Sequence, residues 1–265
     1  MLFEFVFVFL DMNIKAILDE QVERINTIDF IKDDPVQFPH RFSKLQDIEI
    51  TAFTTATIAW GKRSMILRDA DRMLSLMNNT PYDFVMNKGF EYLGKANVHR
   101  TFFQPDLAYI LRGFHSIYSK YDSINDMVKE LEISNDLAPA WRLCEEIRKI
   151  SFLANDKQYN SQCFPSNFNN SALKRINLAI KWLVRNDGIV DLGVWDSIKP
   201  SQLYIPLDVH VGNTARKLGL LNRKSNDRKT VVELTEILRD FNSNDPVIYD
   251  YALFGIGVNG VEIEI

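Results

Sequence analysis

The chain contains few residues of the kinds that build metal centres or covalent cross-links. Its 265 residues include two cysteines, Cys144 and Cys163, and four histidines. None of these lies at the short spacing typical of zinc ligands. Two distant cysteines exclude a multi-disulfide framework and a four-cysteine iron–sulfur cluster, and they fit a reducing cytoplasm. We therefore predict a cytoplasmic protein with no protein-held metal and no cofactor.

The chain also lacks a surplus of positive charge. Lys and Arg number 31 against 35 Asp and Glu, so the net charge is −4. Such a chain has no global basic field that would attract a polyanion, although a local basic face can exist on an acidic protein.

No apolar run is long enough for a membrane span. The stretch 2–10 (LFEFVFVFL) is apolar apart from Glu4, but it is shorter than the roughly 20 residues that cross a bilayer. It also lacks the basic start and the small-residue cleavage site of a signal peptide. We predict no membrane partner and interpret 1–11 as an optional extension, with Met12 as an alternative start; an added edge strand is the alternative.

Helical periodicity recurs along the rest of the chain, which has no internal repeat and no Gly/Ser-rich linker. The composition is that of a globular protein, with 46% hydrophobic and 25% charged residues. We predict an all-α fold with 12–265 as a single domain, made of helical subdomains 30–160 and 12–29 plus 161–265. Helices are expected at 13–27, 48–60, 64–77, 104–120, 139–153, 171–185, 208–218 and 246–255.

Polar residues mark several of the helix starts. The stretch 230–233 (TVVE) is a capping box, and Ser123 opens a similar sequence with Asp126 in place of Glu. Ser171 and Asp208 are candidate N-caps.

The segment 172–185 carries a basic stripe. Leu173 and Leu183 lie on its apolar face, while Lys174, Lys181 and Arg185 lie roughly opposite. Periodicity alone favours a solvated basic face. The alternative is a stripe that contacts phosphates, with one lysine reaching into a cleft.

Asp208 precedes a helix whose buried face includes Val211 and Ala215. An aspartate at this position is usually a structural N-cap. It could also stay ionised beside a lysine and take part in chemistry. His210, on the first turn, fits a surface histidine, with contact to a phosphate as the alternative.

Two segments resemble a known superfamily. The stretch 206–211 (PLDVHV), followed by Arg216 and 218–220 (LGL), is similar to the aspartate motif of the helix-hairpin-helix DNA glycosylases. These include endonuclease III and the archaeal 8-oxoguanine glycosylases. The stretch 172–181 (ALKRINLAIK) resembles the helix that carries their lysine nucleophile, with Lys174 at the matching place.

Further segments extend this resemblance. The stretch 49–76 is similar to the helix pair that lines the glycosylase cleft, and 60–63 (WGKR) corresponds to its base-contacting loop. The hairpin is degenerate, because 164–170 (FPSNFNN) keeps Pro165 but has no glycine, and the cluster cysteines of endonuclease III are absent. Over its whole length the chain looks closest to an uncharacterised bacterial family, a domain of unknown function, on the evidence of 174–175, 181–185 and 200–208.

The resemblance implies a DNA repair glycosylase, with or without lyase activity, acting on a damaged base such as 8-oxoguanine. Lys174 would be the nucleophile, and Asp208 its electrostatic partner and proton acceptor. The resemblance and the basic stripe together assign DNA contacts to Trp60, Lys62, Arg63, Arg175, Lys181, Arg185, His210 and Arg216. Trp182 and Trp195 are further candidates for stacking on an extruded base. The alternatives are a non-catalytic DNA-binding or damage-sensing module and a helical protein-interaction scaffold.

Overall fold

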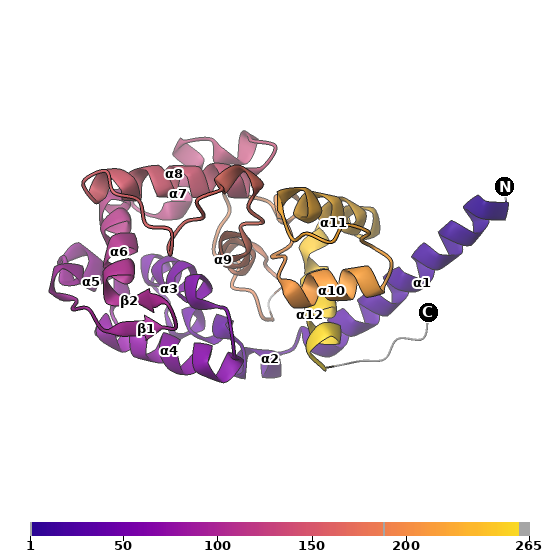
Figure 1. Cartoon of the computed structure of the whole chain (residues 1–265), viewed down its shortest axis with the longest axis horizontal. Helices are drawn as coiled ribbons and strands as arrows, with labels where there is room; N and C mark the ends of the chain where they lie inside the picture. Colours follow the sequence, from indigo (N-terminus) through magenta and orange to yellow (C-terminus); the bar gives the residue numbers. More distant parts are fainter. Residues whose placement is uncertain (1, 188, 260–265) are drawn as a thin grey trace.

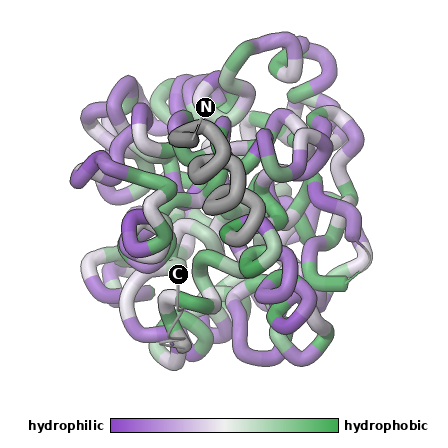
Figure 2. Tube along the Cα trace, turned by 90° about the vertical axis from the view of Figure 1, so that its right-hand side faces the viewer, coloured by the Kyte–Doolittle hydropathy of each residue, from purple (hydrophilic) through white to green (hydrophobic). Residues whose placement is uncertain are grey.

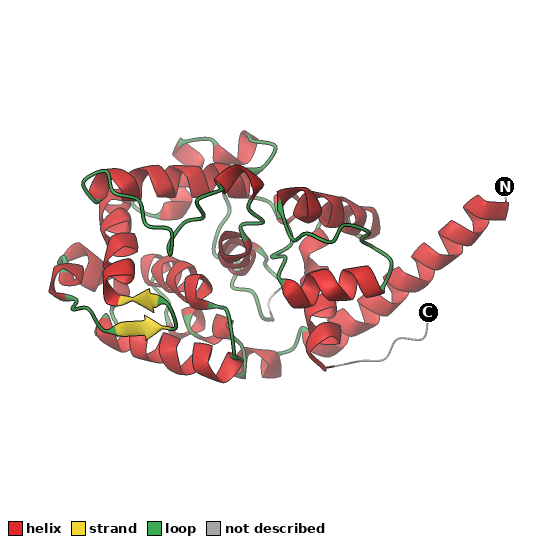
Figure 3. Ribbon diagram, viewed as in Figure 1, coloured by secondary structure: helices red, strands yellow, loops and turns green. Residues whose placement is uncertain are grey.

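The structure, a computed structural model, describes residues 2–187 and 189–259 of the chain. These residues form helices and loops, apart from one short antiparallel hairpin of β1 (Asn97–His99) and β2 (Phe102–Phe103) (Figure 3). The predicted all-α class is therefore confirmed, with this hairpin as an addition. No helix within the two described ranges combines the length and apolarity needed to cross a membrane.

A first group of helices lies on the left of Figure 1. Within it α6 packs along α8, and α5 contacts both α3 and α6. Its members are α3 (Leu45–Ile58), α4 (Arg63–Leu76), α5 (Pro81–Met86), α6 (Gln104–Tyr118), α7 (Ile124–Glu130) and α8 (Pro139–Ala154).

A second group lies on the right, where α12 packs against both α1 and α10 (Figure 1). Its members are α1 (Leu2–Ile25), α10 (Val209–Lys217), α11 (Arg228–Phe241) and α12 (Tyr249–Asn259). Between the two groups lies α9 (Lys174–Val184), which packs against α3 and α8.

Short helices complete the path of the chain between these elements. The first group is reached from α1 through α2 (Ile28–Lys32), η1 (Pro35–Gln37) and η2 (Pro39–Arg41). The others are η3 (Gly89–Tyr92), η4 (Ile133–Asn135), η5 (Phe168–Asn170), η6 (Pro200–Gln202) and η7 (Pro246–Ile248). Apolar side chains from both groups and from α9 form one buried cluster, while many of the outer turns are hydrophilic (Figure 2).

Local sequence explains where several helices begin. The Ser123 hydroxyl accepts a hydrogen bond from the Asp126 amide at 2.9 Å, and α7 starts directly after it, as the capping pattern predicts. The predicted capping box at Thr230 is wrong. Asp227 caps α11 instead, because its carboxylate accepts from the Thr230 amide at 3.0 Å. Ser171 is not an N-cap either, since α9 begins three residues later, after Leu173.

The N-terminal stretch is neither an edge strand nor a segment that precedes the first helix. Residues 2–25 form one helix, so the edge-strand alternative is wrong and the predicted helix start at residue 13 is too late. An edge strand needs a sheet to join, and the sheet that the described residues contain is the isolated pair β1–β2. Ile14, Leu18 and Val22 are buried, and α1 packs along α12.

Glu49, fully buried in α3, fixes three other segments to that helix. Its carboxylate accepts hydrogen bonds from the amides of Ile124 and Asn125, both at 2.9 Å, at the start of α7. It also accepts from the Tyr118 hydroxyl at 3.0 Å and from the Trp195 indole at 2.8 Å. Burial raises the pKa of Glu49 to about 7, although the four hydrogen bonds act to lower it.

The described part of the insert, 189–204, which has no counterpart in the glycosylase resemblance, is anchored by this contact. Trp195 is buried, and so is Trp182 in α9. Both rings belong to the core, so the suggestion that they stack on an extruded base is wrong for this conformation.

We expect the substitution Glu49→Gln to lower the free energy of unfolding by about 2–4 kcal/mol at pH 8, where the native carboxylate is ionised. Gln has an amide nitrogen where Glu49 has one of its two acceptor oxygens, so this nitrogen would face N–H donors that it cannot accept from. Urea unfolding followed by circular dichroism measures the change. Glu145→Gln, an exposed position in α8, is the matched control, and equal stabilities of the two variants would contradict the role given to Glu49.

Candidate functional site

Lys174 is the first residue of α9 and lies between the two groups of helices. It follows Leu173, whose backbone is left-handed (φ 46°), and its Nζ donates to the Ala59 carbonyl at 2.9 Å, just past the end of α3. The side chain is half-buried. Burial lowers the pKa of Lys174, and nearby carboxylates oppose this in part.

Three aspartates from different elements supply these carboxylates. Asp208 caps α10 as predicted, accepting from the Val211 amide at 2.9 Å. Asp250 is buried in the first turn of α12, and Asp34 is buried at the start of η1. Burial raises the pKa of Asp250 to about 6 and also raises that of Asp34. Asp208 therefore lies close enough to Lys174 for its charge to raise the lysine pKa, and so do two carboxylates that the sequence did not suggest.

A cavity of about 450 Å³ adjoins Lys174. Leu207 and Asn226 border it on the side of Asp208, and the Asn226 amide donates to the Asp208 carbonyl at 3.0 Å. The other walls come from α3, α6, α8, the loop 161–165 and the start of α9: Phe53, Thr57, Ile110, Phe114, Cys144, Ile147, Ser161, Cys163, Phe164, Pro165, Ser171, Ala172, Leu173, Arg175 and Ile176. The lining of the cavity is thus mostly apolar, and Lys174 and Arg175 add two cationic groups to it.

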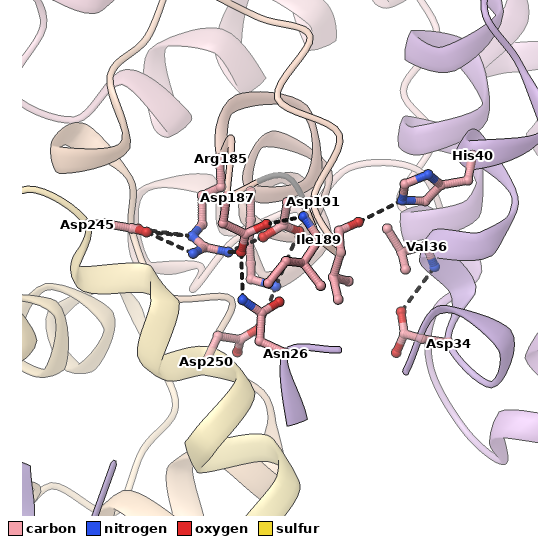
Figure 4. A network of polar contacts seen from close by, with 12 residues as sticks. Asn26, Asp34, Val36, His40, Arg185, Asp187, Ile189, Asp191, Asp245 and Asp250 are labelled. Carbon is pink, nitrogen blue, oxygen red and sulfur yellow. Dashed lines mark hydrogen bonds and ion pairs between the residues drawn. The ribbon is translucent and has the colours of Figure 1, made fainter. Parts of the chain in front are cut away.

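Arg185, at the C-terminal end of α9, is the centre of a buried ion network (Figure 4). Its side chain is 0% exposed and binds Asp245 through Nε (2.9 Å) and Nη2 (2.8 Å). Its Nη1 contacts Asp191 and lies 3.1 Å from Asp187. Burial opposes the charge, but these carboxylates outweigh it and raise the pKa of Arg185 above its ordinary value.

Lys181, one turn earlier in α9, belongs to the same network. It is 2% exposed, and its Nζ lies 3.5 Å from Asp191, 3.4 Å from Asp250 and 3.6 Å from the centre of the Tyr251 ring. The prediction of a solvated basic stripe is therefore wrong for Lys181 and Arg185. Carboxylates from the segment 187–191 and from around α12 cover that face of the helix, which leaves neither cation able to reach a phosphate in this conformation.

The predicted base-contacting loop, 60–63, lies beside Lys174. Trp60 is half-buried, with its ring edge-on to His99 at 5.3 Å between centroids. Lys62 is exposed. The Arg63 guanidinium lies 5.1 Å from the Phe254 ring centre in α12, so the loop also contacts the second group of helices.

His99 and Asp69 hold this loop from the other side. His99 is fully buried, with Nδ1 2.7 Å from the Asp69 carboxylate and Nε2 2.8 Å from the Trp60 carbonyl. His99 therefore connects the loop to Asp69 in α4.

The remaining predicted DNA contacts have different environments. Arg175 donates to the Gln162 carbonyl at 2.7 Å and lines the cavity, and burial lowers its pKa. His210 is exposed at the start of α10. Arg216 donates to the Arg223 carbonyl at 2.6 Å and to Asn226 at 2.5 Å. Arg216 therefore organises the loop 223–226, which in turn supports Asp208.

Several residues of the site have no local sequence signal. Asp34, Asp191 and Asp250 lie in loops or first turns, where aspartate is common for conformational reasons. Asp191 and Asp250 matter because they pair with Lys181 in α9, and Asp34 matters because its charge acts on Lys174. Of the three, only Asp191 is close to α9 in the sequence. Within the ranges 2–187 and 189–259, no group of three or more His, Cys, Asp or Glu side chains is arranged to hold a metal ion.

A family model described as "Protein of unknown function (DUF2400)" matches residues 34–259. The chain belongs to this family. The match begins at Asp34 and covers the remaining site residues, including Lys174, Asp208 and Asp250. The expected membership of a family of unknown function is thereby confirmed, while neither a curated protein nor a solved structure matches the chain.

We expect Arg185→Met to lower the free energy of unfolding by about 3–5 kcal/mol, because the buried Asp191 and the half-buried Asp245 lose their shared cation. Chemical denaturation in urea measures this change. Arg148→Met is the matched control, since Arg148 is only half-buried and makes no carboxylate pair with any described residue. A similar stability for both variants would mean that the ion network does not stabilise the fold.

A second expectation concerns pH. Because the folded protein holds the Asp250 proton up to about pH 6, against an ordinary pKa of 3.8, the folded state binds more protons than the unfolded state in this interval. As the pH rises from about 4 to about 6, the free energy of unfolding should therefore fall. The contribution of Asp250 to this fall is up to roughly 3 kcal/mol. In Asp250→Asn this contribution should disappear, whereas an unchanged pH profile of stability would show that Asp250 titrates normally.

Proposed function

We propose that this protein is a DNA base-excision glycosylase with lyase activity, in which Lys174 is the nucleophile and Asp208 its electrostatic partner. The observation that carries the proposal is the placement of Lys174. Its amine is half-buried, has a lowered pKa, and lies among carboxylates beside the cavity at the start of α9. A lysine attacks carbon only as the neutral amine, and partial burial makes that form more accessible.

The reaction that fits these groups proceeds through a covalent intermediate. The Lys174 amine attacks C1′ of the damaged deoxynucleotide, and a nitrogen–carbon bond forms as the bond between C1′ and the base breaks. The departing base takes the electron pair and a proton. Asp208 stabilises the positive charge that develops on the sugar and accepts the proton released by the amine. Opening of the sugar ring gives a Schiff base, from which a C2′ proton and the 3′ phosphate are eliminated.

Several features support the helix-hairpin-helix glycosylase resemblance behind this proposal. The lysine opens one helix, the aspartate caps another, and the two lie near each other between groups of helices. A cavity of about 450 Å³ is large enough for an extruded purine such as 8-oxoguanine, and its phenylalanines offer apolar contacts to a planar base.

One contact favours a second candidate function. The Lys174 amine donates to the Ala59 carbonyl, which is also what a purely structural lysine would do. In that case the protein would be a non-catalytic DNA-binding or damage-sensing module that keeps the same arrangement of helices.

Borohydride trapping on duplex DNA that contains 8-oxoguanine or an abasic site separates the two candidates. We expect a covalent protein–DNA adduct that is lost in Lys174→Gln and kept in Lys149→Gln, an exposed lysine of α8. Asp208→Asn keeps an N-cap side chain but removes the charge, and it should slow adduct formation by roughly 10²- to 10⁴-fold.

The other outcomes are equally informative. Salt-sensitive DNA binding without an adduct would favour the sensing module. An adduct that persists in Lys174→Gln would place the nucleophile at another amine. Neither adduct nor binding would leave the protein-interaction scaffold as the better explanation.

A further inference from the structure

The turn between β1 and β2 holds an arginine in an unusual backbone conformation. Arg100 has φ 50°, in the left-handed region that glycine and asparagine adopt far more readily. The Asn97 side-chain amide donates to the Arg100 carbonyl at 2.5 Å and fixes this geometry. Glycine would form the same turn without strain, so the Arg100 side chain can be removed there without disturbing the backbone.

The Arg100 side chain stacks on Trp60. Its guanidinium carbon lies 4.5 Å from the centre of the Trp60 ring, within the range of a cation–π contact. Gly61 makes the approach possible, because a Cβ atom there would lie 2.5 Å from Arg100 Nη1.

Arg100 is also a cation with no carboxylate partner among residues 2–187 and 189–259. The nearby Arg68 and Arg72 both pair with Asp69. Arg100 is exposed and pairs with no carboxylate in the ranges that the structure describes, and the same holds for the exposed Lys62. Arg100 and Lys62 thus place two exposed cations at the loop 59–62.

This loop is the one that receives Lys174. The Ala59 carbonyl accepts from Lys174, and the Trp60 carbonyl contacts His99, the residue directly before Arg100. The guanidinium of Arg100 and the amine of Lys174 are therefore held by adjacent residues of one short segment.

We propose that Arg100, stacked on Trp60, binds a backbone phosphate of duplex DNA next to the nucleotide that Lys174 attacks. The inference rests on the proposed function. A guanidinium donates two parallel hydrogen bonds to a phosphate, and an aromatic ring behind it restricts its orientation. Under the glycosylase resemblance, this contact would take the place of the hairpin's glycine amides, since 164–170 contains no glycine.

Binding to a duplex with a tetrahydrofuran abasic analogue, which lacks the C1′ leaving group, tests the site without catalysis. In Arg100→Gly we expect a roughly three- to tenfold loss of affinity at 0.1 M salt and a fall of about one in the slope of log K against log salt. The thermal midpoint should not fall, since glycine suits the left-handed turn. Lys88→Gly is the matched control, because Lys88 is another exposed cation at a positive φ (56°), in the loop after α5.

Fluorescence anisotropy titrations give the affinities. Arg100→Lys keeps the charge but not the planar group, and it should bind with intermediate affinity. Equal affinities of Arg100→Gly and the wild type would overturn the proposal, as would wild-type protein that does not bind the duplex. A selective loss in Arg100→Gly without any borohydride adduct at Lys174 would support the phosphate site while refuting the lyase function.

Discussion

The neutralisation of two buried cations on α9 is the constraint on which the arrangement of the two helical groups depends. A guanidinium and an ammonium removed from water are strongly destabilising unless carboxylates accompany them. Arg185 and Lys181 obtain these from the segment 187–191 and from Asp245 and Asp250 around the start of α12. The C-terminal half of α9 is thereby tied to α12, while its other face packs on α3. Because α9 is a single rigid helix, this attachment also determines where Lys174, at its opposite end, is placed.

The electrostatic character of the site follows from the same arrangement. Carboxylates outnumber amines near Lys174, so its charged form is favoured by Asp208, Asp250 and Asp34 while burial disfavours it. The balance leaves a lysine with a lowered pKa that still has proton acceptors close by.

Local features of the sequence predicted much of the fold. The starts of α7 and α10 depend on a side chain three residues from its partner, which is why Ser123 and Asp208 could be identified as caps. The buried helix α3 was recognisable from the length of its apolar run. The hairpin β1–β2 was missed because five residues in strands carry too little periodicity to detect.

The errors lie where distant segments meet. Helical periodicity correctly placed Lys174, Lys181 and Arg185 on one stripe, but it does not say what covers that stripe. The partners of Arg185 include Asp245, which lies sixty residues further along the chain. No local sequence pattern predicts such a contact. The pair of Lys174 and Asp208 was predicted through a resemblance and not through spacing. Arg100 was missed because its significance depends on Trp60 and Gly61, which reach it only in the folded chain.

The pairing of α9 and α1 with α12 has a consequence for synthesis of the chain on the ribosome. Residues 45–154 form the first group of helices, and they emerge early enough to pack while translation continues. The partners of Arg185 and Lys181 at residues 245–250 are synthesised later. The buried face of α1 can pack against α12 only after more than two hundred further residues have been added. Closure of the second group, and with it the assembly of the lysine and its carboxylates, is therefore a late event in the life of the new chain.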